Sequence, residues 1–251
     1  MKYTFGLYPD KPDKRDYLLR RVVSPVEIRD RVNYSRIMLP VRHQGAEGVC
    51  AAMAGAAMKE WQEVSDCNLS EHLSVRWLYQ QAKANDDYPG QEGTTLRDIM
   101  STLFSYGICL EKRWPYKPHK PGQPKKGAYA EATNFKISGY AKLTTILDME
   151  KCLNGQGPFL MGMRVGPTWD SPENGIIKDP PTRFIPRGGH AVLCVGYDRH
   201  QKEFLIRNSW GQKWGSHGYA WVSYYHVQRC FISAWSSVDI TGSIYDPENQ
   251  K

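Results

Sequence analysis

In the stretch "HQGAEGVCAAMAGAAM" at residues 43–58, a glycine-bearing turn leads into a run of small and apolar residues. Met53, Ala57 and Trp61 recur at helical spacing, which predicts a helix with one apolar face from about Val49 to Trp61. Cys50 lies in the first turn of that helix. It is either a small packing residue or a reactive thiol, and the rest of the chain decides between them.

The composition is that of an ordinary folded protein. The 251 residues are 41% hydrophobic and 24% charged, and they carry a net charge of +7. Part of the basic excess lies in a Lys/Pro/Gly loop at 116–127 and part near the N-terminus, and no groove-reading motif accompanies it. We therefore expect a solvated basic surface and no nucleic-acid partner.

The sequence has neither the apolar core of a signal peptide nor about 18 consecutive apolar residues that could span a membrane. Three locations stay open: the cytoplasm, export by a leaderless or specialised route, or export after removal of a leader. The six cysteines are widely spaced, without a C-x-x-C pair. We expect reduced thiols, no disulfide and no metal site.

The first half of the chain reads as helical. A second helix is expected within "SEHLSVRWLYQQAKA" (70–84), with Ser70 as a plausible N-cap, and a third within "TTLRDIMSTLFSYG" (94–107), which Gly107 ends. The Pro/Lys/Gly stretch at 117–127 then marks the boundary between two parts of different character.

The second half is richer in strands. One short helix is predicted at "TILDMEKCLNG" (145–155). It is followed by the strand-like runs "FLMGMRV" (159–165), "HAVLCVGY" (190–197), "EFLIRNSW" (203–210) and "YAWVSYY" (219–225). Helices followed by antiparallel strands indicate an α+β protein of two packed lobes.

A cysteine nucleophile needs a stabilised thiolate, a histidine, a group that orients the histidine, and donors for the oxyanion. The start of a helix favours a thiolate at Cys50. His190 begins an apolar strand after two glycines, and Asn208 follows another strand, where Trp210 could screen its bond to the imidazole. Gln44 lies six residues before Cys50, so its amide could join the Cys50 backbone N–H as an oxyanion donor.

Three motifs carry a family resemblance. In order, "PVRHQGAEGVCAAMAGA", "GGHAVLCVGYD" and "RNSWGQKWGSHGY" resemble the cysteine, histidine and asparagine motifs of the papain-like cysteine peptidases, and the similarity extends over about Pro40 to Val238. His190 comes 140 residues after Cys50, within the family's spacing of about 130–150, and Asn208 at 158 lies slightly beyond it. "PDKRDY" (12–17) and Arg97–Asp98 resemble the bacterial branch.

The resemblance implies a papain-like fold: a helical lobe that carries the nucleophile helix, an antiparallel β-barrel-like lobe, and an active site in the cleft between them. Cys50 would attack a peptide carbonyl, His190 would protonate the leaving amine, Asn208 would orient His190, and Gln44 would bind the oxyanion. Gly93 would lie beside an extended substrate. The other implied substrate-binding residues are Thr94, Gly162, Gly188, Gly189, Ala191 and Trp210. No cofactor is implied.

Two residues depart from the family pattern. Glu47 stands where the family has a disulfide-bonded cysteine, and Ala51 stands where it has a tryptophan. A carboxylate three residues before the thiol opposes thiolate formation if it points inward, and favours the helix N-terminus if it faces water. The sequence leaves both orientations of Glu47 open.

We expect one catalytic domain at 26–245, with a helical lobe at about 40–117 and a β-rich lobe at about 128–240. Residues 1–25 would form a tail packed on the surface with a possible regulatory role, and 246–251 a C-terminal tail. The expected activity is that of a monomeric endopeptidase acting on polypeptides. Two alternatives stay open: the same acyl-enzyme used for transfer or glutamine deamidation, and a catalytically silent binding module.

Overall fold

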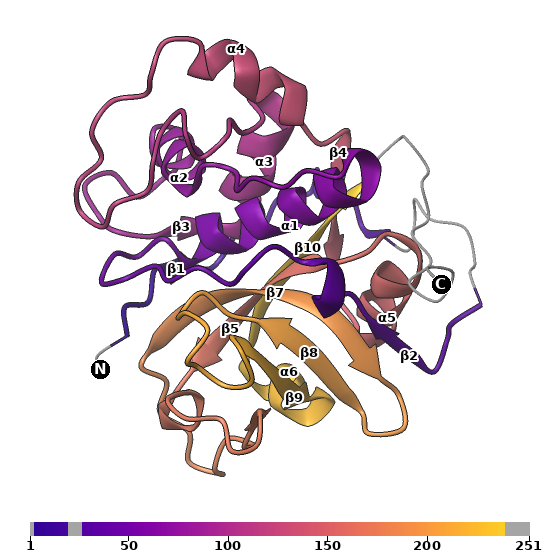
Figure 1. The fold of residues 1–251 in the computed structure, drawn as a ribbon. Coiled ribbons are helices and arrows are strands. Elements are labelled where there is room, and N and C mark those ends of the chain that lie inside the picture. The colour runs from indigo at the N-terminus through magenta and orange to yellow at the C-terminus, as the bar shows by residue number, and fades with distance from the viewer. Residues whose placement is uncertain (1–2, 20–26, 239–251) are drawn as a thin grey trace.

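The long helix α1 (Cys50–Cys67) lies between a group of helices on one side and a large sheet on the other (Figure 1). The structure is a computed structural model and describes residues 3–19 and 27–238. The expected C-terminal tail at 246–251 and parts of the expected N-terminal tail, at 1–2 and 20–25, lie outside the described residues.

The longer strands lie in the second half of the chain, whereas helices occur in both halves. The remaining α-helices are α2 (Val75–Lys83), α3 (Leu96–Ser105), α4 (Ala128–Ala132), α5 (Ile146–Gly155) and α6 (Tyr224–Cys230), and the short 3-10 helices are η2 (Ser35–Ile37), η3 (Thr133–Phe135) and η4 (Pro167–Trp169). The strands are β1 (Leu7–Tyr8), β2 (Arg31–Asn33), β3 (Thr94–Thr95), β4 (Gly139–Leu143), β5 (Phe159–Val165), β6 (Ile176–Ile177), β7 (Gly188–Asp198), β8 (Glu203–Arg207), β9 (Tyr219–Ser223) and β10 (Phe231–Val238).

The large sheet has eight strands in the order β4-β10-β5-β7-β8-β9-β6, with β2 paired to β7 beside this path. Its pairings are antiparallel except for β6 with β9. Two of the three strands that pair with β7, β5 and β8, are strands that the sequence predicted. The predicted α+β class, with helices packed beside a mostly antiparallel sheet, is confirmed.

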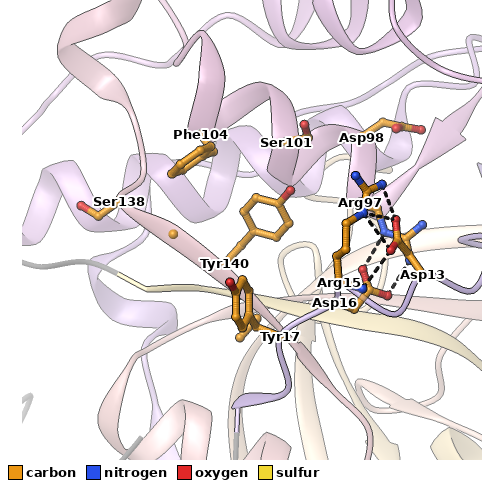
Figure 2. A pocket seen from close by; sticks show the side chains of 12 residues that line it. Asp13, Arg15, Asp16, Tyr17, Arg97, Asp98, Ser101, Phe104, Ser138 and Tyr140 are labelled. Atoms are coloured by element: carbon orange, nitrogen blue, oxygen red, sulfur yellow. Dashed lines mark hydrogen bonds and ion pairs between the residues drawn. The ribbon is translucent and has the colours of Figure 1, made fainter. Parts of the chain in front are cut away.

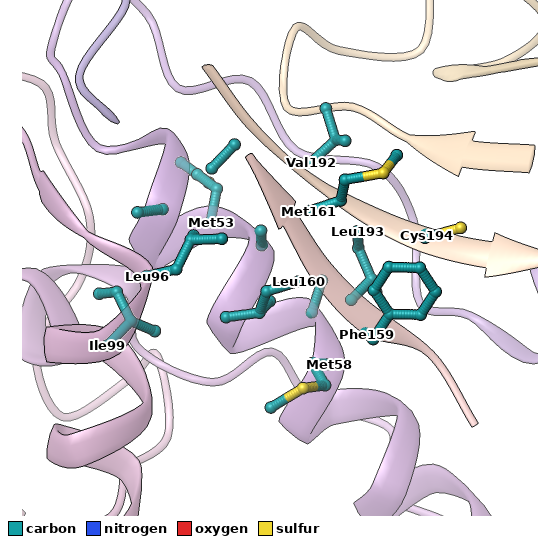
Figure 3. Close-up of a cluster of buried hydrophobic side chains, with 14 of the residues drawn as sticks. Met53, Met58, Leu96, Ile99, Phe159, Leu160, Met161, Val192, Leu193 and Cys194 are labelled. Atoms are coloured by element: carbon teal, nitrogen blue, oxygen red, sulfur yellow. The ribbon is translucent and has the colours of Figure 1, made fainter. Parts of the chain in front are cut away.

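The core lies where α1 packs against β5 and β7 (Figure 3). Met58, Leu160 and Leu193 are fully buried there, and Ile99 joins them from α3. The helix α1 therefore packs against α2 and α3 on one side and against β5 and β7 on the other. The helix continues beyond Trp61 to Cys67, where Asn68 adopts a left-handed conformation with φ of 55° and ends it.

Local capping fixes where the other helices begin. The prediction of Ser70 as the N-cap of the second helix was wrong: α2 begins at Val75, and the Ser74 hydroxyl accepts the backbone N–H of Trp77 at 3.0 Å. The third and fourth predictions hold more closely, since Thr95 caps α3 and Thr145 forms a capping box with Asp148 at the start of α5.

The described part of the chain contains all six cysteines, each as a free thiol. Within residues 3–19 and 27–238, no helix combines the length and apolar character that a membrane crossing requires. In the same residues, no cluster of histidine, cysteine or acidic side chains has the arrangement of a metal site.

Candidate active site

Cys50 is the first residue of α1, at the point where the helix meets β7. Its side chain is fully buried, and the backbone N–H groups of Ala191 and Gly6 act to lower the pKa of its thiol. Burial raises the pKa of the Cys50 thiol, and these backbone donors oppose that shift only in part. For the buried thiol, exclusion of water therefore outweighs the benefit that a helix N-terminus gives to a thiolate.

His190 lies on β7, one residue before Ala191, and is also fully buried. Its Nε2 is 2.8 Å from Oδ1 of Asn208, so the ring donates Nε2–H to the amide oxygen. Burial lowers the pKa of His190 to about 4, although the bond to Asn208 works in the opposite direction. Nδ1 has no hydrogen-bond partner among the described residues, which leaves it available to the thiol.

Two tryptophans enclose the His190 ring. Trp210 stacks on it with ring centroids 4.6 Å apart, and Trp169 meets it edge-on at 6.1 Å. Trp210 therefore covers the imidazole as well as lying beside Asn208. These aromatic faces fix the plane of the ring and keep water from its bond with Asn208.

The amide of Gln44 is oriented from both ends. Ser209 donates its hydroxyl to Gln44 Oε1 at 2.6 Å, and Gln44 Nε2 donates to the carbonyl of Glu47 at 3.0 Å. With the oxygen held by Ser209, the second Nε2 hydrogen is directed to the carbonyl of Thr4, 3.2 Å away.

The carboxylate of Glu47 is turned away from the thiol and toward helix α2. Both of its oxygens accept from Arg76, at 2.7 and 2.6 Å, and Oε2 also accepts the backbone N–H of His119 at 3.0 Å. Burial acts to raise the pKa of Glu47, but these bonds hold it below its usual value. Glu47 is therefore an ionised, paired carboxylate.

The N-terminal strap, residues 3–19, contains β1, which pairs with β3 and contacts β7 of the large sheet (Figure 1). Tyr3 stacks on Trp210 with ring centroids 3.9 Å apart, and Phe5 lies edge-on to His190 at 6.2 Å. Leu7 is buried, with 6% of its surface exposed. Residues 3–8 of the strap, the cleft segment, thus cover the buried Cys50 and His190.

The cleft segment contacts most of the residues that the sequence predicted to bind substrate. Thr94 donates its backbone N–H to the Gly6 carbonyl at 2.9 Å. The glycines make close approach possible, since a Cβ added at Gly162 would lie 2.5 Å from Leu7 Cδ2 and one at Gly93 would lie 2.4 Å from the Gly6 oxygen. Contacts of the same kind involve Gly188 with Phe5 and Gly189 with Leu7. The N–H of Gly93 is donated to the Tyr79 hydroxyl.

Beyond the cleft, residues 10–19 of the strap, the anchor segment, are held by hydrogen bonds and ion pairs. Asp10 accepts from the Arg97 backbone N–H at 3.0 Å and from Trp235 Nε1 at 2.7 Å. Asp16 accepts from Arg97 Nε and Nη2 at 3.0 and 2.6 Å, and from Lys142 at 3.4 Å. A cavity of about 690 Å³ lies between the anchor segment, α3 and β4, away from Cys50 (Figure 2).

Sequence reasoning missed several residues of this site. Ser209 stands between the two motif residues Asn208 and Trp210, so its position was a usable signal for a role beside Gln44. Arg76 and Trp169 come from α2 and η4, far from the motifs in sequence, and nothing local marks them. The cleft segment has no periodicity that would indicate where it packs.

The comparisons with known proteins agree with this geometry. The model of the family described as "Papain family cysteine protease" matches residues 24–240. The crystal structure of xylellain, a cysteine protease from Xylella fastidiosa, has a TM-score of 0.84 and 28% identity, covering 94% of this chain and 96% of that one.

Two curated relatives point the same way. A peptidase C1-like protein of Acanthamoeba polyphaga mimivirus is 28% identical over 98% of this chain and 91% of its own length. Cathepsin K of Mus musculus is 28% identical over 90% of this chain and 70% of its own length. The likeness to xylellain supports the bacterial branch that the sequence predicted. The chain belongs to the papain family of cysteine proteases.

Proposed function

We propose that this protease hydrolyses peptide bonds as an endopeptidase through a thiol acyl-enzyme, with Cys50 as nucleophile and His190 as acid and base. The observation that carries the proposal is the buried bond of 2.8 Å between His190 Nε2 and Asn208 Oδ1. It fixes the ring so that Nδ1 is the nitrogen left for the thiol. The residue after His190 is Ala191, whose backbone N–H acts to lower the pKa of the Cys50 thiol.

In the first step, the Cys50 sulfur adds to the peptide carbonyl and its proton passes to His190. The oxyanion receives hydrogen bonds from Gln44 Nε2 and the Cys50 backbone N–H. His190 then gives the proton to the leaving nitrogen, which departs as an amine and leaves a thioester. Water adds to the thioester with His190 as base, and the carboxylic acid and free thiol are released.

Product mass tests the reaction type. Incubation of the full chain with a peptide substrate is expected to give two fragments whose masses sum to the peptide plus one water. A mass gain of about one dalton without cleavage indicates deamidation, and a new amide on an added amine indicates transfer. Cys50→Ala is expected to abolish the product; surviving turnover would place the nucleophile elsewhere. A wild-type chain with no covalent reaction at all supports the silent binding module.

We infer further that the N-terminal strap inhibits its own protease in the closed state, in which the cleft segment covers Cys50 and His190. The support is its position: Tyr3, Phe5 and Leu7 pack on the predicted substrate-binding surface, and the Thr4 carbonyl accepts from Gln44 Nε2, the proposed oxyanion donor. A substrate and the cleft segment then compete for one surface. The regulatory role expected for the N-terminal tail would then be competitive inhibition of substrate binding.

A further inference from the structure

Glu47 sits inside the loop that joins the two proposed oxyanion donors, Gln44 and the backbone of Cys50. Only 5% of its surface is exposed, and Arg76 is fully buried. The pair is bidentate, with both carboxylate oxygens on separate guanidinium nitrogens at 2.7 and 2.6 Å. This is the geometry in which a carboxylate is held most rigidly by an arginine.

Arg76 connects three segments that the sequence keeps apart. It belongs to α2, it binds Glu47 in the loop before α1, and its Nη2 also donates to the carbonyl of Lys117 at 2.7 Å. Its guanidinium lies over the ring of Tyr116, 4.9 Å from the centroid. The His119 backbone N–H completes the enclosure of Glu47.

The same cluster holds Gln44 in place. The carbonyl of Glu47 accepts one Nε2 hydrogen of Gln44 at 3.0 Å, and the Tyr116 hydroxyl donates to the Gln44 carbonyl at 2.6 Å. A shift of Glu47 therefore removes the partner that directs the Gln44 amide. The next residue, Gly48, donates its N–H to Glu92 at 3.1 Å, so the loop has a second tether on the cleft side.

We propose that Glu47 and Arg76 form a positioning pair that fixes the direction of the Gln44 amide for oxyanion binding. The inference rests on the proposed function. The pair touches neither substrate nor the reacting atoms; it acts through the loop at 44–49. Because Arg76 neutralises Glu47 and draws it toward α2, the carboxylate also stays directed away from the thiolate.

Two variants test the pair in the full chain. Glu47→Gln keeps the shape and removes the charge, but it leaves Arg76 buried without its carboxylate. The double variant Glu47→Leu with Arg76→Met removes both charges, which avoids an unpaired buried ion and preserves folding better. The matched control is Glu63→Gln, which breaks the largely buried Lys59–Glu63 pair on the same helix as Cys50 but far from the loop.

Hydrolysis and alkylation are measured side by side. We expect both test variants to lower kcat by about 10- to 100-fold, with KM within about twofold, because an oxyanion donor acts in the transition state. Alkylation of Cys50 by iodoacetamide forms no oxyanion and should stay within about twofold of wild type across the pH range. The strap must open before either reaction, so its opening equilibrium cancels in the ratio of the hydrolysis rate to the alkylation rate. Glu63→Gln should change neither.

The proposal is overturned if the double variant melts like wild type and keeps its kcat within about twofold. It is also overturned if alkylation falls in parallel with kcat, because the pair would then act on the thiol or on folding instead of the oxyanion. Failure of the proposed function has a different signature: the wild-type chain itself would show no hydrolysis that depends on Cys50.

Discussion

Tyr3 lies parallel to the indole of Trp210, with the ring centroids 3.9 Å apart and the planes at 8°. The same indole covers His190 at 4.6 Å. One tryptophan thus links the first described residue of the chain to the proposed catalytic imidazole. Displacement of the strap must break this stack, so strap position and exposure of the active site change together.

Gly6→Ala should activate the protease. A Cβ at residue 6 would lie 2.1 Å from the carbonyl oxygen of Gly48. A backbone oxygen cannot move aside as the end of a flexible side chain can, so we expect the cleft segment to move out. We expect kcat/KM on a peptide substrate to rise about tenfold, which corresponds to about 1.4 kcal/mol lost from strap docking. Lys14→Ala, an exposed position of the same strap, is the control. An unchanged kcat/KM in Gly6→Ala would show that the strap does not limit substrate access.

Arg97→Gln should have a similar effect from outside the cleft. It removes the bidentate ion pair that holds Asp16, whose side chain is 11% exposed, and weakens the anchor segment without altering any cleft residue. A partly buried charged hydrogen bond contributes about 1.5–3 kcal/mol, so we expect kcat/KM to rise at least about fivefold. Lys112→Gln, which breaks the exposed pair with Glu71, serves as control. Equal kcat/KM in both variants would exclude a role for the anchor.

The strap should remain intact during turnover. Residues that precede Gly6 lie on Trp210 and His190, whereas Leu7, which follows it, lies against Gly162. The leaving nitrogen of a peptide belongs to the residue after the attacked carbonyl and must face His190 to be protonated. The strap runs in the opposite direction, so the residues that follow Gly6 point away from His190. The intact mass of the full chain should therefore stay constant while an added peptide is cut. Loss of the first residues would contradict this reversed chain direction of the strap.

Acid should loosen the cleft segment. Burial lowers the pKa of His190 from 6.5 to about 4, so between these values the closed state binds fewer protons than an open one. Lowering the pH from 7 to 5 therefore favours opening, by about an order of magnitude. Hydrogen exchange of residues 3–8, corrected for its intrinsic pH dependence, measures this in Cys50→Ala, which lacks the competing thiol. The double variant with His190→Gln should lose the effect; if it persists there, other groups are responsible.

Local sequence patterns were enough to place the proposed reacting groups on or next to their helix and strands. The spacing of Met53, Ala57 and Trp61 indicated α1 with Cys50 in its first turn, and glycine and apolar runs indicated the strands next to His190 and Asn208. These signals are short-range, because a helix face or a strand end is encoded within about ten residues. The order of the three motifs then joined them into one site.

Tertiary contacts decided what the sequence left open. Ser70 and Ser74 are both good caps, but the Ser74 hydroxyl also donates to the Trp114 carbonyl at 2.6 Å, which favours helix entry there. The orientation of Glu47 depended on Arg76, 29 residues away, and no local signal pairs the two. The strap contacts residues far away in the sequence, such as Arg97 and Trp235, and periodicity carries no information about such contacts.

The strap belongs to the chain that it is proposed to inhibit, so the proposed inhibition does not depend on protein concentration. Dilution lowers the occupancy of a free inhibitor, whereas a tethered segment keeps a constant effective concentration, typically in the millimolar range for a short connection. The fraction of closed molecules is therefore expected to be the same at high and at low protein concentration. Substrate concentration, pH or a substitution that weakens the contacts of the strap would instead alter how much of the protease is open.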